Sequence, residues 1–299
     1  SRGLGDVYKR QTRNRDMEEI TMKLVNGFKL MEYAKRNNFV LPAFNTTNLE
    51  MTYAIVDGLM KANLPGYIQI SSNNLRLSNP AIITDIAADA VKKSETPIGL
   101  HLDHGKSFED VKACIDAGFT SIMIDASHLP FEENVKECRR AADYCHFYGI
   151  PVEAELGALR GKEEDIVNEA ECKTDPAMVA EFVEKTGCDT LAVSVGNVHG
   201  LCLNPQIDIP LLEKINQVSK VPLVLHGGSG IPKEVIWEAK KHGLIKINYG
   251  SDLRKEFVKT FGHAYEENHN EHDVIHLSLE AVEEVSRKAQ ELVTMINEH

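Results

Sequence analysis

The stretch "PIGLHLDHGKSFEDVKACIDAGFTSIMID" (97–125) contains the unit that decides the fold. Two short apolar runs, 97–103 and 119–125, flank a longer segment of helical character. Short apolar strands that alternate with helices are typical of a parallel sheet covered by helices. The first run ends in "HLDHG" (101–105), which places two imidazoles and a carboxylate at the point where the chain should simply turn. Such a strand end is either a solvated polar cap or part of a metal site.

The same strand-and-helix unit repeats along the chain from residue 39. The candidate strands are 39–45, 66–71, 97–103, 119–125, 150–156, 189–195, 221–226 and 243–248. Eight units are the number that closes a (β/α)8 barrel. We therefore predict an α/β fold, a single TIM barrel over residues 22–299 with an extra C-terminal helix at 278–297. Residues 1–21 are charged and lack apolar periodicity, and we expect an extraneous leader or a disordered arm there.

Composition argues against several partners. The net charge is −12, whereas nucleic-acid binding needs clustered Lys and Arg to displace counterions. No apolar stretch approaches the roughly 20 residues that a membrane span needs. The six cysteines form no C-x-x-C pair and are typical of a reduced protein. We expect a cytoplasmic protein with no nucleic-acid or membrane partner.

Three histidines follow predicted strands at the end of the barrel where TIM-barrel active sites are built. They are His104, His199 and His226, and each is followed directly by Gly. Three protein ligands leave one coordination position open, which is the arrangement of a catalytic metal. The alternative interpretation is that each histidine is an ordinary polar strand end.

Further features at the same end suggest an anion site and acid–base groups. The Gly-rich segments "HGGSG" (226–230) and "NYGSDLR" (248–254) precede helices and offer backbone N–H groups to an anion, unless they are plain turns. Asp103 is placed to move a proton on a substrate hydroxyl. The long charged loop 157–176 is typical of a lid, and Glu163 or Glu164 could act there as a base, unless the loop is merely a solvated acidic segment.

Seven motifs together resemble the class II, metal-dependent fructose- and tagatose-bisphosphate aldolases. They are "FVLPAFNTTNLE", "HLDHG", "DAGFTSIMIDASH", "VEAELG", "NVHG", "LHGGSGIP" and "KINYGSDLR", and the resemblance runs from Met22 to Arg254. It implies an aldehyde-lyase that reversibly cleaves a ketose 1,6-bisphosphate to dihydroxyacetone phosphate and glyceraldehyde 3-phosphate. It also implies a phosphorylated sugar as the small-molecule partner and a homodimer or homotetramer.

The resemblance also assigns roles to residues. Zn²⁺ is expected on His104, His199 and His226. Asp103 corresponds to the acid that protonates the C4 oxygen, and Glu163 to the lid base for the C3 proton, with Glu164 as its competitor. Asp125 and Glu155 correspond to an alternative metal position, and Asn45 and Ser71 to the aldehyde end of the site. Contacts to the first phosphate and the triose, near a monovalent cation (Na⁺ or K⁺), correspond to Gly200, Gly228, Ser229, Asn248 and Ser251.

Two departures from the family pattern concern the substrate. Asn197 stands in "GNVHG" where the family usually has Thr or Ser, and no Pro-Arg precedes the last helix. His272 lies near the expected place of that arginine, which grips the second phosphate in the family; Arg76 is the nearest cation that could compensate. The alternatives are therefore an aldolase whose aldehyde product carries no phosphate, and a non-enzymatic phosphosugar-binding barrel. A metal-free Schiff-base route would need Lys246, and three placed histidines make it the weaker interpretation.

Overall fold

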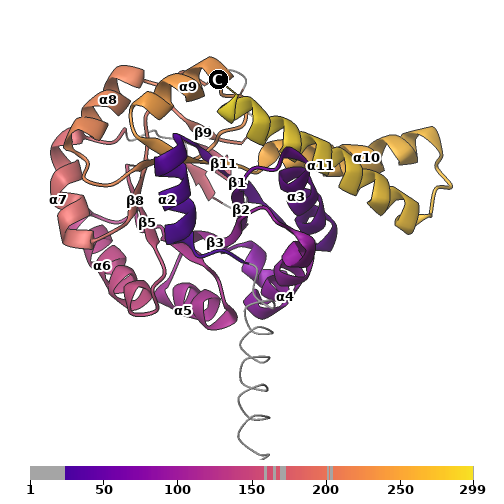
Figure 1. The fold of residues 1–299 in the computed structure, drawn as a ribbon, viewed down its shortest axis with the longest axis horizontal. Helices are drawn as coiled ribbons and strands as arrows, with labels where there is room; N and C mark the ends of the chain where they lie inside the picture. Colours follow the sequence, from indigo (N-terminus) through magenta and orange to yellow (C-terminus); the bar gives the residue numbers. More distant parts are fainter. Residues whose placement is uncertain are drawn as a thin grey trace, which may run out of the picture.

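The computed structural model describes residues 24–157, 160–163, 166–168, 173–200, 202 and 205–298. Eight parallel strands close into a barrel in the order β1-β11-β10-β8-β5-β4-β3-β2 (Figure 1). The strands are β1 Leu41–Asn45, β2 Gly66–Ser71, β3 Ile98–Gly105, β4 Ser121–Ile124, β5 Val152–Leu156, β8 Thr190–Val193, β10 Leu223–Leu225 and β11 Leu244–Tyr249. The predicted TIM barrel is confirmed, and the eight predicted strands correspond to these. The leader expected at 1–21 lies outside the described residues.

Helices cover the outside of the barrel, and local sequence signals explain where several of them begin. The Asn48 side chain accepts a hydrogen bond from the Met51 amide, and the Ser107 side chain accepts one from the Asp110 amide, as N-caps do. The helices that follow the strands are α3 Leu49–Ala62, α4 Pro80–Ala90, α5 Phe108–Ala117, α6 Phe131–Phe147, α7 Pro176–Thr186, α8 Ile209–Val218, α9 Lys233–Lys241 and α10 Ser251–Glu267. Short 3-10 turns, η1 Asn74–Arg76 and η2 Val91–Lys93, flank α4.

An additional helix, α2 (Gly27–Asn37), lies against the amino end of the barrel. The Val25 amide donates to the Ile98 carbonyl and the Gly27 amide donates to the Thr120 carbonyl, both near strand starts. The helix therefore covers part of this end, and the site lies at the opposite end, where the strands finish.

The predicted C-terminal helix is confirmed as α11 (Val274–Asn297), and it packs against α3. A Cβ added to Gly58 would stand 2.6 Å from the Ser286 carbonyl oxygen and 2.8 Å from the Ala289 Cβ, so the two helices touch at a position that only glycine fits. Figure 1 shows α10 and the first half of α11 projecting from the barrel as a hairpin. No helix in the described part of the chain is long and apolar enough to cross a membrane.

Part of the long charged loop predicted at 157–176 contributes strands to a small second sheet. It contains β6 (Arg160–Glu163), β7 (Ile166–Asn168) and β9 (Val198–His199), in the order β7-β6-β9. Two short strands therefore lie within the predicted loop, and its role as a lid stays a prediction. The pairing of β6 with β9 joins segments far apart in sequence, which no local pattern indicates.

Candidate active site

The three predicted histidines meet at the carboxyl end of the barrel. His104 lies in β3, His199 in β9, and His226 directly follows β10. Their ring centroids are 4.6 Å apart for His104–His226, 5.2 Å for His104–His199 and 6.1 Å for His199–His226. One ring nitrogen from each lies within 4.8 Å of the others. The histidines therefore form one cluster, not three separate polar caps.

The backbone at two of these strand ends adopts left-handed conformations, at His104 and at Gly227. His104 itself has φ 46°, in the left-handed region that non-glycine residues rarely occupy. Gly227 has φ 63°, and a Cβ there would stand 2.2 Å from the Val198 carbonyl oxygen. Glycine after His226 therefore allows the loop to lie directly against β9, which carries His199.

Asn197, the departure noted in the sequence, bridges the same two segments. It is fully buried, its side-chain oxygen accepts from the Val195 amide at 2.9 Å, and its side-chain nitrogen donates to the His226 carbonyl at 3.0 Å. Asn197 therefore fixes the segment before His199 relative to His226.

Hydrogen bonds set the ring tautomers so that the histidines fit a metal. The His226 Nε2 lies 2.8 Å from the Glu153 Oε1, and the His104 Nδ1 lies 2.7 Å from the Asp125 Oδ2. Because an ionised carboxylate only accepts, these ring nitrogens carry the protons and leave a lone pair on the opposite nitrogen. The His226 Nδ1 is buried and has no hydrogen-bond partner among the described residues. Carboxylate-oriented imidazoles around one point fit a divalent metal such as zinc.

The predicted alternative metal position lies beside the first. His104, Asp125 and Glu155 also offer three ligand atoms within 4.8 Å of one another, and the Glu155 Oε2 is 3.6 Å from the His226 Nδ1. Burial by itself would raise the pKa of Asp125, but the hydrogen bonds that it accepts from His104 and Ser127 outweigh burial and hold that pKa well below its usual range. In this structure Asp125 also orients His104.

Asp103 is fully buried next to the histidines and is held by side-chain amides from three strands. Its Oδ2 accepts from the Asn45 Nδ2 at 2.8 Å and from the Gln69 Nε2 at 3.2 Å. Its Oδ1 accepts from the Asn248 Nδ2 at 3.0 Å and lies 4.0 Å from the His104 Nε2. The amides fix the carboxylate beside the cluster. Gln69 was not among the predicted site residues, because a polar residue inside a strand gives no separate signal.

A hollow at the mouth collects most of the residues predicted to bind phosphate. Ser229, Asn248 and Ser251 line it, with Asn45, His199, Gly200, Gly227 and Gly250. Gly228 lies beneath, and its amide donates to the Asn248 carbonyl at 2.8 Å. Arg254, from the first turn of α10, also lines the hollow and was missed as a site residue. A cation and the N-terminus of a helix are both suited to an anion.

Other predicted residues lie farther out or are only partly described. Ser71 is buried at the end of β2, in register with Asp103. The Glu163 backbone ends β6, two residues after Gly161, which is paired with His199; its side chain and Glu164 lie outside the described residues. The same holds for the side chain of Arg76. His272 is exposed in the turn between α10 and α11, and its Nδ1 contacts the Asn270 carbonyl.

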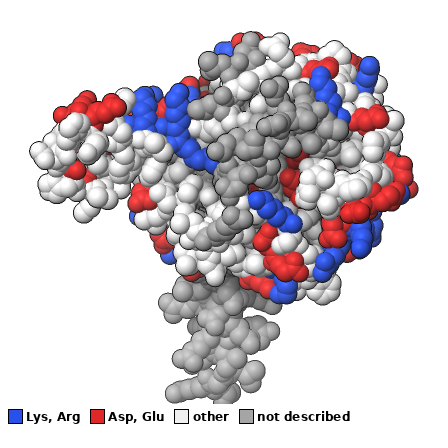
Figure 2. Space-filling view, turned by 180° about the vertical axis from the view of Figure 1, so that it is seen from behind, with Lys and Arg blue, Asp and Glu red and all other residues white. Residues whose placement is uncertain are grey.

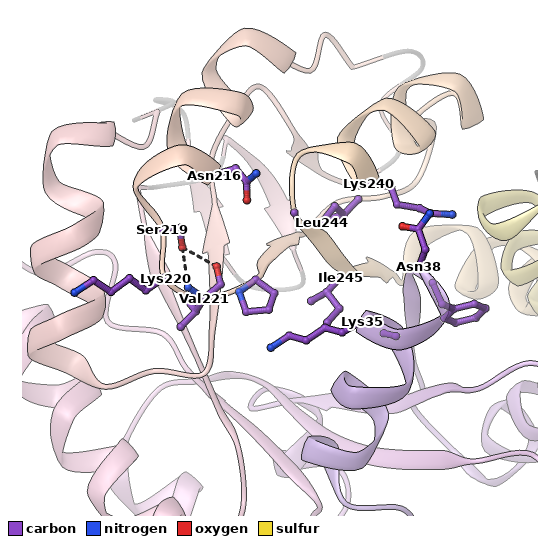
Figure 3. A pocket seen from close by; sticks show the side chains of 13 residues that line it. Lys35, Asn38, Asn216, Ser219, Lys220, Val221, Lys240, Leu244 and Ile245 are labelled. Carbon is purple, nitrogen blue, oxygen red and sulfur yellow. Dashed lines mark hydrogen bonds between the residues drawn. The ribbon is translucent and has the colours of Figure 1, made fainter.

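A second hollow, of about 340 Å³, lies at the opposite end of the barrel (Figure 3). It is lined by Lys35, Lys220 and Lys240, with the starts of β10 and β11. Lys35 and Lys240 belong to the last turns of α2 and α9, where lysines stabilise the negative end of the helix dipole. Figure 3 shows the three lysines spread around the hollow instead of converging on it. We assign no ligand to it.

The fold and the mouth together define the class of metal-dependent barrel enzymes: a closed (β/α)8 barrel, three clustered histidines and a buried carboxylate at the end of the strands. The family model described as "Fructose-bisphosphate aldolase class-II" matches residues 25–299. The chain belongs to this family, as the motifs predicted. Members of this family are aldehyde-lyases that act on phosphorylated sugars.

Relatives and solved structures agree. The fructose-bisphosphate aldolase of Geobacillus stearothermophilus is 40% identical over 242 residues, 80% of this chain and 84% of that protein. That of Staphylococcus aureus (strain Mu50) is 40% identical over 235 residues, 77% of this chain and 82% of that protein. The crystal structure of the YdjI aldolase from Escherichia coli K12 superposes with a TM-score of 0.80 at 32% identity and covers 92% of this chain and 97% of its own. The fructose-bisphosphate aldolase of Campylobacter jejuni, at 22% identity and a TM-score of 0.77, covers 92% of this chain and 95% of its own and shares the fold.

Proposed function

We propose that the protein is a zinc-dependent aldolase that reversibly cleaves a ketose 1,6-bisphosphate of the fructose or tagatose type. The products are dihydroxyacetone phosphate and glyceraldehyde 3-phosphate. One observation carries the proposal: three histidines with oriented rings share a point beside the buried carboxylate of Asp103. A zinc ion held by His104, His199 and His226 would act as a Lewis acid toward the substrate's oxygens and favour the charge that develops on cleavage.

The chain's own residues move the protons. Asp103 takes the proton of the C4 hydroxyl in cleavage and returns it in condensation, and its three amide donors keep it aimed at that hydroxyl. Glu163 exchanges the C3 proton of dihydroxyacetone phosphate, which is supported by the pairing of its strand with the strand of His199. Glu164 is the competing base. Asp125 and Glu155 offer the metal a second position.

The first phosphate of the substrate binds in the hollow at the mouth. Ser229 and Ser251 supply hydroxyl donors, and the Gly228 amide, which donates to the Asn248 carbonyl, holds the loop beside them. Asn248 connects this site to Asp103. Arg254 supplies positive charge there, alongside a monovalent cation, Na⁺ or K⁺. Asn45 and Ser71 line the aldehyde end of the substrate.

One observation favours a second candidate, an aldolase whose aldehyde product is not phosphorylated. The turn between α10 and α11 lies at the tip of the projecting hairpin (Figure 1). His272 belongs to this turn and contacts the chain's own backbone at the Asn270 carbonyl. Histidine is mostly neutral at pH 7 and offers no bidentate fork to phosphate. A hydrogen bond to a charged group contributes roughly 1.5–3 kcal/mol. Without the bond that an arginine would make to the second phosphate, the enzyme should prefer phosphorylated over unphosphorylated aldehydes only weakly.

The projecting hairpin supports a homodimer or homotetramer. It carries exposed apolar side chains on α10 and α11: Val258, Tyr265, Val274, Ile275 and Leu279. Figure 2 shows white surface over much of the outer part of the hairpin, with acidic groups along one edge and basic groups where the hairpin joins the barrel. The described cysteines are free, which fits a reducing compartment, and we place the enzyme in the cytoplasm.

The test is condensation of dihydroxyacetone phosphate with a panel of phosphorylated and unphosphorylated aldehydes. C–C bond formation with at least one aldehyde supports the aldolase, and its absence with every aldehyde contradicts it. The variants His272→Arg and Arg76→Ala locate the second phosphate. A strong phosphate preference that disappears in Arg76→Ala places that phosphate at Arg76 and rules out the second candidate.

A further inference from the structure

A chain of buried polar side chains lies one layer below the histidine cluster, inside the barrel. The Glu153 Oε1 accepts from the His226 Nε2 at 2.8 Å, and its Oε2 accepts from the Lys246 Nζ at 2.9 Å. Lys246 also lies 3.3 Å from the His101 Nε2, and the His101 Nδ1 is 2.8 Å from the Ser121 Oγ. These side chains come from β3, β4, β5 and β11, and all of them are buried.

Three members of this chain, Lys246, His101 and Glu153, have a fixed donor or acceptor role. Lys246 only donates, so it needs acceptors from both Glu153 and His101. Burial and the Lys246 charge hold the pKa of His101 well below its usual value, so this ring is neutral and accepts at Nε2. Glu153 is therefore held by Lys246 through one oxygen and presents the other to His226.

Structural filling alone is a poor explanation for this charged pair. A buried ion pair is costly to desolvate, and replacing one with apolar residues of similar volume is often neutral or stabilising. The barrel interior elsewhere accommodates apolar side chains, as at Met123, Ala192 and Val224. The feature that distinguishes Glu153 is its second contact, to a member of the histidine cluster.

We propose that Glu153 and Lys246 are positioning residues for His226: Lys246 orients Glu153, and Glu153 holds the proton on Nε2 so that Nδ1 faces the metal position. Two residues, Glu153 and His226, thus separate Lys246 from the metal position, and Lys246 is not a Schiff-base nucleophile. The inference rests on the proposed metal site. Losing such an outer partner typically weakens metal binding by about 10- to 100-fold.

The direction of the hydrogen bonds gives a sharp test. In Glu153→Gln, Lys246 must take the amide oxygen, because it can only donate. The amide nitrogen then faces His226 Nε2 and donates to it, which moves the ring proton to Nδ1, the wrong nitrogen for the metal. In the double variant Glu153→Gln/Lys246→Met the amide is free to turn, and its oxygen again accepts from Nε2.

The experiment measures the Zn²⁺ dissociation constant by competition with a chromogenic chelator. We expect Glu153→Gln to bind Zn²⁺ about 10- to 100-fold more weakly than wild type, and the double variant to recover much of that loss. The control is Lys240→Met, which removes a lysine at the other end of the barrel and should leave affinity unchanged. Unchanged affinity in Glu153→Gln, or a double variant no better than the single one, overturns the inference.

A second measurement does not depend on a folded variant. The ¹⁵N shifts of metal-free wild type should show His226 protonated at Nε2, and a proton on Nδ1 would contradict the assignment. The wild type also separates this inference from the proposed function. If wild type neither binds Zn²⁺ nor catalyses condensation, the function fails; if it does both while Glu153→Gln binds Zn²⁺ normally, only the positioning role fails.

Discussion

Gly227→Ala should damage the active site far more than the stability of the fold. A Cβ at this position would stand 2.2 Å from the Val198 carbonyl oxygen and 2.7 Å from its carbon. Ordinary contact distances are about 3.5 Å, so the loop after His226 and the strand of His199 must separate by about 1 Å. A misplacement of this size can reduce the rate by about 100-fold.

The backbone contributes a separate, smaller cost. Gly227 has φ 63°, and an L-residue held there costs roughly 1–2 kcal/mol. Gly149 gives a matched control, because it has φ 69° and no described residue has an atom within 4 Å of a Cβ added there. Gly149→Ala therefore pays the conformational cost without the clash, and should lower Tm by a few degrees and leave activity intact.

The assay compares kcat/KM and Zn²⁺ affinity of the two variants in parallel with their melting curves. We expect Gly227→Ala to lose about 100-fold in kcat/KM and to bind Zn²⁺ more weakly, while Gly149→Ala resembles wild type in both. Equal activity and equal Zn²⁺ affinity in the two variants would refute the argument that close contact at Gly227 brings His226 to His199.

Three further predictions concern separate parts of the molecule. Glu163→Ala should suppress solvent exchange of the C3 proton of dihydroxyacetone phosphate, whereas Asp103→Ala should impair cleavage while exchange survives. The affected rate should fall on the order of 10²–10⁴-fold, and normal exchange in Glu163→Ala would assign the base to Glu164 instead. Arg254→Gln should raise KM for dihydroxyacetone phosphate by about 10- to 100-fold, with Arg254→Lys less affected, and an unchanged KM would remove Arg254 from the phosphate site. Gly58→Ala should lower stability by roughly 1–3 kcal/mol without changing Zn²⁺ affinity, because α3 and α11 must separate. Gly262→Ala should not lower it, because no described residue lies within 4 Å of a Cβ added there, and equal melting temperatures of the two variants would contradict this packing.

The strand ends could be predicted because two signals coincide there. Short apolar runs that alternate with helical segments marked the eight strands, and the polar residues that follow them had to meet once the barrel closed. His104, His226 and Asp103 were found in this way. The family resemblance, and not the strand pattern, supplied the roles of Asp125 and Glu155.

The residues that support the site carry no comparable sequence signal. Gln69 and Lys246 lie inside strands, where only the barrel's closure shows which side chains share a layer. Asn197 was noticed as a departure from the family, but its bridge to the His226 carbonyl depends on two segments that meet only in space. The pairing of β6 with β9 is equally non-local. The sequence therefore reveals the reactive groups and leaves their positioning to the fold.

Metal dependence tests the central claim most directly. The protein is demetallated with EDTA, and condensation of dihydroxyacetone phosphate with glyceraldehyde 3-phosphate is measured before and after Zn²⁺ is added back, with borohydride trapping in parallel. We predict loss of activity on demetallation, recovery with about one Zn²⁺ per chain, since the three histidines form one cluster, and no inactivation by borohydride. Full activity in the metal-free protein, or borohydride inactivation that depends on substrate, would contradict the account.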